Sequence, residues 1–219
     1  MCFGSNETTC PDDNLYRIIG VFNNQVKLIK ATSYGNYAWE QDNIDQRNTW
    51  DETTKPDIYA TLNTTYYNTL GSEWQNLIAE TIWQVGGMVR NTTNTVKQYY
   101  DVEVGTGQSG YEETMKIGLM YVSDYGYSAN LEKWTTALFG TDYGIDNWLY
   151  SGNKEWTISR NSNDKSFVFF VYSDWGIGDV SAAAYATSNS FVIRPTFYLN
   201  SDVQYISGIG SQSNPFRIA

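Results

Sequence analysis

The sequence predicts an α+β fold in a single domain. An alternating pair of β-rich segments spans residues 16–31, helical spacing spans residues 57–69, and strand-like segments return from residue 155 onward. Strands, then helices, then strands again are typical of an α+β domain. The 219 residues suffice for one large domain or two small ones, and no linker-like stretch divides them. We therefore expect an N-terminal lead-in segment over residues 1–14 and one domain over residues 15–219.

The best-defined local element is a hairpin near the N-terminus. Residues 16–22 are rich in β-branched and aromatic side chains, and residues 26–30 alternate between apolar and polar. Asn23 and Asn24 lie between them, and asparagine tolerates the positive φ that a two-residue turn needs. The pattern predicts two antiparallel strands joined at these residues.

Two helices are predicted next. Apolar residues recur at four-residue spacing within residues 57–69, directly after Pro56. Gly71 ends this segment, and Ser72 and Gln75 have the spacing of a capping box. The sequence thus predicts a second helix with Ser72 as its N-cap, and an α-hairpin packed on a sheet.

The rest of the chain is predicted as strands separated by loops. An irregular loop is expected over residues 32–55, a polar insertion over 88–114, and a short amphipathic helix or turn over 130–139. The expected strands are residues 82–85, 116–123, 155–160, 166–172, 191–199 and 214–218.

Charge and hydropathy exclude two classes of partner. The net charge is −10 and the pI about 4.4, and no basic stripe is visible. Nucleic-acid binding requires such a stripe, and so does attachment to an anionic membrane surface. No apolar run of the length of a membrane span occurs either. We expect no nucleic-acid partner and no membrane segment in this chain.

The sequence contains no histidine, which narrows the possible chemistry. Ser-His-Asp and Cys-His arrangements and His-ligated zinc are excluded. Carboxylate catalysis stays possible in principle. However, the adjacent pairs Glu112-Glu113, Asp12-Asp13 and Asp51-Glu52 would point to opposite faces of a strand, which disfavours joint acid–base work. We expect no enzymatic activity, no cofactor and no metal site.

Cys2 and Cys10 are the two cysteines of the chain. Two thiols cannot form a structural zinc site alone. A disulfide between them would close a small loop at the N-terminus and imply an oxidising compartment. The alternative is a pair of free thiols in a frayed terminus.

A series of short segments along the chain carries a resemblance to known proteins. The segments are Leu15-Tyr16-Arg17-Ile18-Ile19-Gly20-Val21, Leu77-Ile78 with Trp83-Gln84-Val85-Gly86-Gly87, Lys116-Ile117-Gly118-Leu119-Met120-Tyr121-Val122-Ser123-Asp124-Tyr125-Gly126-Tyr127, Glu155-Trp156-Thr157-Ile158-Ser159 and Ile193-Arg194-Pro195-Thr196-Phe197-Tyr198-Leu199. In this order they resemble a family of surface proteins from gut Firmicutes that often carry a pilin-like N-terminal anchor. The resemblance spans almost the whole chain. The C-terminal order, a Trp-containing strand, a varied stretch and a final Arg-Pro strand, also resembles the formylglycine-generating-enzyme-like branch of the C-type-lectin fold.

That resemblance implies a C-type-lectin-like fold and a location for ligand binding. Some members are targets of diversity-generating retroelements, which vary a C-terminal binding face on a fixed scaffold. The corresponding region here is residues 160–194, and its aromatic and small residues suit a binding surface. The alternative is an ordinary loop between strands with half-buried aromatics. The ligand contacts expected from the resemblance are Phe167, Phe169, Tyr172, Asp174, Trp175, Ile177, Asp179, Ser181, Ala183, Tyr185, Asn189 and Phe191.

Two departures from related proteins limit the possible activity. The oxidase branch needs a reactive cysteine pair in its C-terminal half, which this chain lacks. The Glu-Pro-Asn or Gln-Pro-Asp and Trp-Asn-Asp motifs of calcium-dependent lectins are also absent, and Asp146-Asn147-Trp148 has the wrong order. Neither oxidase activity nor a calcium-dependent sugar site is expected.

The expected function is that of an extracellular, receptor- or adhesin-like binding domain. Its partner would be a protein or glycan ligand on another cell or surface, and an anchoring segment outside this chain would hold it on the cell surface. A structural pilus or fibre subunit and a carboxylate-dependent cell-wall hydrolase are the alternatives. Arg194, which precedes a proline in an apolar strand, is expected to have a buried partner.

Overall fold

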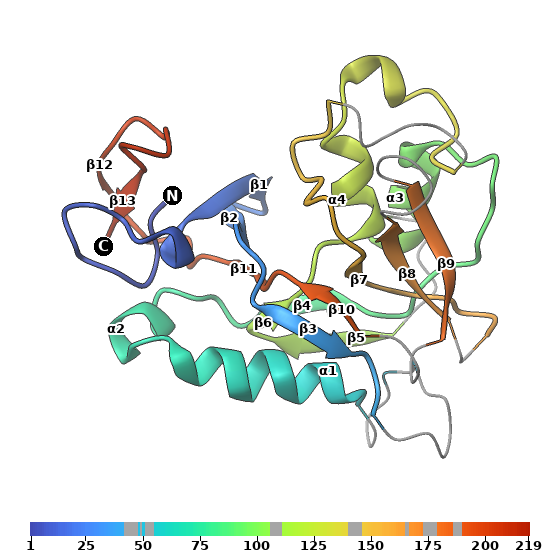
Figure 1. Ribbon diagram of the computed structural model, residues 1–219, viewed down its shortest axis with the longest axis horizontal. Coiled ribbons are helices and arrows are strands. Elements are labelled where there is room, and N and C mark those ends of the chain that lie inside the picture. Colours follow the sequence, from blue (N-terminus) through green and yellow to red (C-terminus); the bar gives the residue numbers. More distant parts are fainter. Residues whose placement is uncertain are drawn as a thin grey trace.

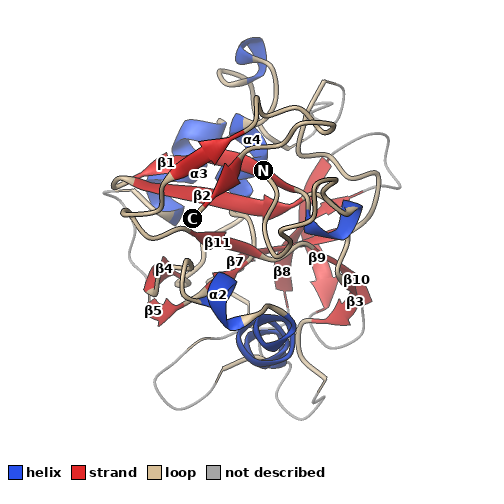
Figure 2. Cartoon of the chain, turned by 90° about the vertical axis from the view of Figure 1, so that its left-hand side faces the viewer, coloured by secondary structure: helices blue, strands red, loops and turns tan. Residues whose placement is uncertain are grey.

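The computed structural model describes residues 1–41, 48, 50, 55–105, 111–139, 146–164, 167–172, 179–185 and 190–219, with the backbone alone at Tyr172 and over 179–185. Its elements form an α+β arrangement of small sheets with helices on opposite sides (Figure 1). The long helical segment lies beneath the sheets, seen end-on in Figure 2, and α3 and α4 lie above them beside β7.

Two sheets contain most of the strands. The first has the order β1-β2-β11-β6, and the second has the order β3-β10-β7-β8-β9, in which β10 and β7 are parallel and the other pairs antiparallel. A two-stranded sheet, β4-β5, and a C-terminal hairpin, β12-β13, complete the strands of the described residues. The bounds are β1 Tyr16–Phe22, β2 Gln25–Lys30, β3 Gly35–Ala38, β4 Thr81–Gln84, β5 Glu112–Met115, β6 Ile117–Gly118, β7 Glu155–Arg160, β8 Phe167–Tyr172, β9 Asp179–Tyr185, β10 Ser190–Ile193, β11 Thr196–Tyr198, β12 Tyr205–Ser207 and β13 Arg217–Ile218.

The helices are short except for one continuous segment. That segment joins α1 to a π-helical stretch, η2, and to a final 3-10 turn, η3. The bounds are η1 Asp12–Asn14, α1 Asp57–Ala60, η2 Thr61–Tyr66, η3 Tyr67–Thr69, α2 Ser72–Gln75, α3 Val96–Glu103, α4 Val122–Tyr127 and η4 Leu131–Lys133.

The N-terminal hairpin and the long helical segment confirm the sequence predictions. Asn23 and Asn24 have φ values of 51° and 62°, so β1 and β2 are joined by the positive-φ turn that their asparagines favour. Helix runs continuously over 57–69, and its four-residue spacing buries Ile58, Leu62 and Tyr66 against the sheets.

The capping box predicted at Ser72 is wrong. Gly71 precedes α2, and the side chain of Gln75 donates instead to the carbonyls of Tyr67 and Leu70, both at 2.9 Å. Those carbonyls belong to the end of the preceding helical segment, which has no further turn to supply donors. Gln75 therefore closes the first helix rather than opening the second.

The region 88–114 is not the polar insertion that the sequence predicts. It contains α3, which begins with a capping box: Gln98 Oε1 accepts from the backbone of Thr95 at 2.8 Å, and the Thr95 hydroxyl accepts from Gln98 N at 3.4 Å. Tyr99 is fully buried on its inner face. A polar sequence was sufficient for a helix because only one face of α3 meets the core.

Two predicted strands are broken in the structure. Within 116–123 only Ile117–Gly118 is a strand, and α4 begins at Val122. Gly118 passes against Trp83, where an added Cβ would lie 2.6 Å from the ring. Within 191–199, Pro195 separates β10 from β11, which belong to different sheets. Proline cannot donate to a ladder, and here it marks the crossing between the sheets.

The core lies on both faces of β8. Val168 and Phe170 pack on one side with Trp156 and Phe191, and Phe169 and Val171 pack on the other side, in the cluster that contains Tyr99, Phe139 and Leu149. Because both faces are covered, the four successive residues 168–171 of β8 are all buried, and this part of the strand shows no polar alternation.

The two chain termini meet, as Figures 1 and 2 both show. Cys2 and Cys10 are joined by a disulfide, as the sequence predicts, and Cys2 N donates to Phe216 O at 2.9 Å. Phe3 is fully buried and packs against Trp74 and Phe197. The residues of the N-terminal lead-in segment thus contribute directly to the core.

Candidate functional site

The predicted ligand contacts divide by how much of each the structure describes. Four lie outside the described residues: Asp174, Trp175, Ile177 and Asn189. Five have a described backbone only: Tyr172, Asp179, Ser181, Ala183 and Tyr185. Three are described with their side chains: Phe167, Phe169 and Phe191.

Two of the described contacts are core residues. Phe169 is fully buried against Tyr99 and Phe139, and Phe191 is 8% exposed and packs on Trp156 at a ring-centroid distance of 4.4 Å. Neither side chain is placed to contact a ligand, which corrects the prediction for these two residues. The physical reason is that the sheet is covered on both faces, so alternation does not separate an exposed face from a buried one. Phe167 is half-buried at the start of β8.

The five predicted contacts with a described backbone lie on β9, at the edge of the second sheet, or on the neighbouring end of β8. β9 is the last strand in the sheet order and pairs with β8, from Phe167 opposite Tyr185 to Tyr172 opposite Asp179. The register shifts between Val168 and Phe170, so the alternation of the sequence does not continue in step through the whole hairpin. The structure therefore brings these residues to one sheet edge, next to a strand that is anchored on both faces.

A different part of the molecule contains a hollow whose walls are formed by described residues, and we call it the aromatic groove. It consists of two adjoining hollows of about 170 and 80 Å³ that share Phe22, Tyr100, Ser123 and Asp124. The β1-β2 hairpin, α3 and α4 supply the shared residues. The other lining residues come from these elements, from β4 and β11 and from the segment before β7, and they are Ile19, Asn23, Lys27, Ile82, Gln84, Val104, Tyr121, Tyr127, Ser128, Trp148 and Tyr198.

A buried ion pair forms the floor of the aromatic groove. Lys27 Nζ lies 2.6 Å from Asp124 Oδ2, and Lys27 is 1% exposed. Four rings surround the ammonium group at 4.3–5.7 Å from their centroids: Phe22, Trp83, Tyr121 and Tyr198. Burial alone would lower the pKa of Lys27, but Asp124 and Tyr198 more than offset it and raise that pKa above its usual value. Lys27 is therefore a fixed cation inside an aromatic cage.

A second buried carboxylate fixes the helix that carries Asp124. Glu103, at the end of α3, accepts from the backbone N–H groups of Val122 and Ser123 at 2.9 Å each, and from the Ser159 hydroxyl. Asp124 Oδ2 accepts from Tyr121 N at 2.7 Å. Burial raises the pKa of Glu103, and the hydrogen bonds oppose that shift. The first turn of α4 is thus held by two carboxylates, so the floor of the groove is rigid.

The walls of the aromatic groove are also held in place. The Tyr121 hydroxyl accepts from Gln84 N at 2.8 Å, which ties α4 to β4. The Arg17 guanidinium donates to the carbonyl of Trp148, whose ring is 40% exposed. Neighbouring Asn147 is buried and donates to Tyr125 O at 2.9 Å. The rim that carries Trp148 is therefore anchored from both sides.

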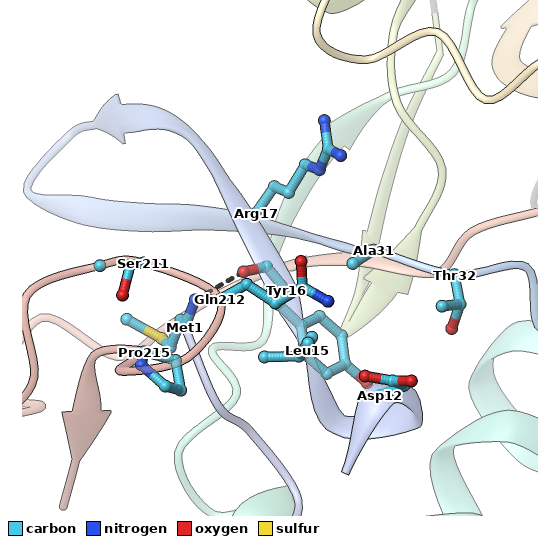
Figure 3. A pocket seen from close by; sticks show the side chains of 11 residues that line it. Met1, Asp12, Leu15, Tyr16, Arg17, Ala31, Thr32, Ser211, Gln212 and Pro215 are labelled. Carbon is cyan, nitrogen blue, oxygen red and sulfur yellow. Dashed lines mark hydrogen bonds between the residues drawn. The ribbon is translucent and has the colours of Figure 1, made fainter. Parts of the chain in front are cut away.

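A larger hollow of about 420 Å³ lies near the chain termini (Figure 3). The ammonium group of Met1 donates to Tyr16 O at 2.6 Å across it, and Figure 3 shows the Arg17 side chain pointing away from Met1 and Pro215. Its lining therefore lacks the convergence of rings and buried charges found in the aromatic groove. Convergent polar groups within an aromatic lining are the more usual mark of a binding site.

Acidic side chains are few in the lining of the aromatic groove. Among its described lining residues, Asp124 is the one carboxylate, and it is already paired with Lys27. Glycoside hydrolysis needs two carboxyl groups facing each other across the substrate, and these lining residues supply no second one. Within the described part of the chain, no three Asp, Glu, Cys or His side chains gather as metal ligands. No described helix is long and apolar enough to cross a bilayer.

Sequence reasoning missed the aromatic groove for an identifiable reason. Lys27 and Asp124 are 97 residues apart; Lys27 lies in a segment predicted as an ordinary strand, and Asp124 directly follows the one predicted over 116–123. Tyr100 lies in the predicted polar insertion. The spacing of Thr95 and Gln98 was the available signal, because a capping box there would have predicted α3 and placed Tyr99 and Tyr100 on it.

No protein-family model, curated protein or solved structure matches this chain. The likeness to C-type-lectin-like surface proteins of Firmicutes therefore rests on sequence motifs alone.

Proposed function

We propose that this chain is the non-enzymatic ligand-binding domain of an extracellular bacterial surface protein, acting as a receptor or adhesin. The observation that carries the proposal is the aromatic groove, where half-exposed rings line two hollows above a fixed ion pair. Preformed aromatic hollows with a few fixed polar groups suit ligand recognition, since little ordering is left to be lost on binding.

The connectivity supports a C-type-lectin-like scaffold as part of this proposal. The first and last parts of the chain pair with each other, β2 with β11 and β3 with β10, and the termini meet at Cys2 and Phe216. Such closure leaves a long central stretch to form the surface, as the resemblance implies. In the same proposal, residues 160–194 supply a second contact face along β9, and a diversity-generating retroelement varies it.

An extracellular location agrees with the covalent structure. The Cys2–Cys10 disulfide would persist in an oxidising compartment and not in a reducing cytosol. The net charge of −10 would keep a domain displayed on a cell surface soluble.

Binding of the labelled domain to protein and glycan arrays tests the proposal. Tyr100→Ala and Trp148→Ala should each weaken binding about tenfold or more, because both rings line the groove, Tyr100 half-buried and Trp148 exposed. Tyr205→Ala is the matched control, since this ring is exposed on the C-terminal hairpin, outside the groove lining. Near-UV circular dichroism checks that each variant is folded.

The same experiment separates the two faces. Binding that survives the groove variants but is lost in Tyr172→Ala and Tyr185→Ala would assign the ligand to residues 160–194 and reject the groove. Binding that none of these variants changes would reject both sites.

A fibre subunit is the second candidate, and the C-terminal hairpin favours it. Tyr205, Ile206 and Ile209 are 65%, 58% and 75% exposed, and they form an apolar group on and beside β12. Exposed apolar groups mark association surfaces. Sedimentation that shows concentration-dependent assembly, abolished by Ile206→Asp, would support this function over that of a monomeric receptor.

A further inference from the structure

We propose that the aromatic groove binds a neutral, hydroxyl-rich ring, such as one glycosyl unit of a glycan, and does so without a metal ion. The inference rests on the proposed function and names the class of ligand.

Charge balance in the groove is the first argument. Its one described cation and one described anion are already paired at 2.6 Å and covered by four rings. The nearby Lys97 and Asp101 pair with each other on the exposed face of α3, and Glu103 is buried beneath α4. A charged ligand would lose water at this site without gaining a free counter-charge. A neutral ligand avoids that cost.

The kind of lining is the second argument. Tyr100 and Tyr127 meet edge to face, with ring centroids 6.1 Å apart, and Trp148 adds an exposed indole on the same side. Rings of this kind combine an apolar face with a polar edge. A sugar ring has the matching pattern, with C–H groups on its face and hydroxyl groups around its edge.

The polar atoms at the groove are the third argument. Asp124 uses Oδ2 for both Lys27 and Tyr121 N, and no described residue donates to its Oδ1, which can accept from a ligand hydroxyl. Asn23 lines the same hollow, and its side-chain amide can both donate and accept, whereas the Gln84 side chain already donates to Glu112 at 2.9 Å. Neutral groups of both kinds suit hydroxyls, which also donate and accept.

Size restricts the ligand further. The hollows of about 170 and 80 Å³ adjoin at Tyr100 and Phe22, and each is below the roughly 300–1,000 Å³ of pockets that enclose a whole drug-sized ligand. Two small adjoining hollows fit one ring of an oligosaccharide better than a bulky molecule. The lining also lacks a described cluster of metal ligands, so chelation of metal ions should leave binding unchanged.

Titration of the intact, isotope-labelled domain with neutral tetrasaccharides tests the inference. The probes are chitotetraose, maltotetraose, mannotetraose and xylotetraose, with and without EDTA. At least one should bind, shift the indole resonance of Trp148 and be unaffected by EDTA. Trp148→Ala and Tyr100→Ala should each weaken its binding about tenfold or more, Trp148→Phe should retain much of it, and Tyr205→Ala should leave it unchanged.

The charge argument has its own control. The deacetylated, cationic form of chitotetraose has the same skeleton, and at about 0.5 M salt it should bind more weakly than the neutral form. Tighter binding of the cationic form at that salt concentration would overturn the inference, as would loss of binding with EDTA or the failure of every saccharide to bind.

The remaining outcomes separate this inference from the proposed function. A peptide or protein that binds and shifts Trp148 would overturn the glycan class while leaving the groove as the ligand site. Ligand-induced shifts confined to residues 160–194 would overturn the groove as the ligand site while leaving the proposed receptor function in place.

Discussion

Arg194 lies where β10 ends and the chain crosses to the first sheet, and it is 3% exposed. Its Nε lies 2.7 Å from Glu155 Oε1, and its Nη2 donates to Leu149 O at 2.5 Å. Ser151 donates to the other oxygen of Glu155 at 2.8 Å. The sequence predicts a partner for this arginine, and the structure confirms one. Each charge is tolerated in the core because its partners replace water.

Removing one member of this pair should be costly, while removing both should cost less. Arg194→Met leaves Glu155 buried and unpaired, and we expect it to lower the free energy of unfolding by about 3–5 kcal/mol. Arg194→Met combined with Glu155→Gln should recover at least half of that loss, because no uncompensated charge remains. Urea denaturation of the wild type and the two variants measures both values. A loss below about 1 kcal/mol for Arg194→Met would contradict the role given to the pair.

Glu103 gives a pH dependence whose sign follows from its raised pKa. Between its usual value of 4.5 and the higher value in the folded state, the folded protein binds more protons at this site than the unfolded chain. Its contribution to stability therefore falls as pH rises above 4.5, and it levels off above the folded-state pKa. Glu103→Gln removes the titration, so the difference in unfolding free energy, wild type minus variant, should decrease over this interval. Denaturation curves between about pH 4 and pH 8 measure that difference, and a constant difference would refute the shift.

At the scale of elements, the loop closed by Cys2 and Cys10 holds the C-terminal hairpin through hydrogen bonds to Arg217. The guanidinium of Arg217, on β13, donates to the carbonyls of Ser5, Glu7 and Thr8 at 3.0, 2.7 and 3.2 Å. The disulfide closes the loop across a sequence separation of 8, which holds those carbonyls together. The disulfide thereby supports the contact between the two ends of the chain, which Arg217 makes through its hydrogen bonds.

The disulfide and Arg217 should be energetically coupled. Replacing both cysteines with serine should cost about 2–3 kcal/mol by the chain-entropy account of a loop this short, and Arg217→Ala about 1–3 kcal/mol. The combined variant should cost less than the sum of the two by more than about 0.5 kcal/mol, because the open loop no longer presents its carbonyls to Arg217. Arg160→Ala is the control, since Arg160 donates to Val85 O, away from the loop, and should be additive. Additivity for Arg217 as well would contradict the coupling.

Over the whole molecule, the features predictable from sequence are those that neighbouring residues decide. Asn23 and Asn24 specify a turn, four-residue spacing specifies the helix over 57–69, and Cys2 and Cys10 are close enough to pair. What could not be predicted depends on distant partners.

Three distant contacts explain the principal errors. Pro195 divides a predicted strand because its two halves join different sheets, and β8 lacks alternation because α3 covers its second face. The aromatic groove exists because Lys27 meets a carboxylate 97 residues away. None of these contacts leaves a periodic signal in its own segment, so local patterns assign each residue an ordinary role.

Early strands pair with late ones, β2 with β11 and β3 with β10, and the two termini lie together, which gives a test of the fold as a whole. Joining Ala219 to Met1 by a short Gly-Ser linker should be tolerated, because Cys2 N donates to Phe216 O and Gln204 N to Ala219 O beside it. New termini can be opened between Gly152 and Asn153, which are exposed in a turn with nothing near the Gly152 Cβ position. We expect this permutant to keep the wild-type near-UV spectrum and a cooperative unfolding transition. Opening the chain instead between Leu28 and Ile29, inside β2, should abolish folding, because that strand pairs with both β1 and β11. A folded second permutant would show that the domain does not depend on an intact β2. An unfolded first permutant would contradict the prediction that the joined termini are tolerated.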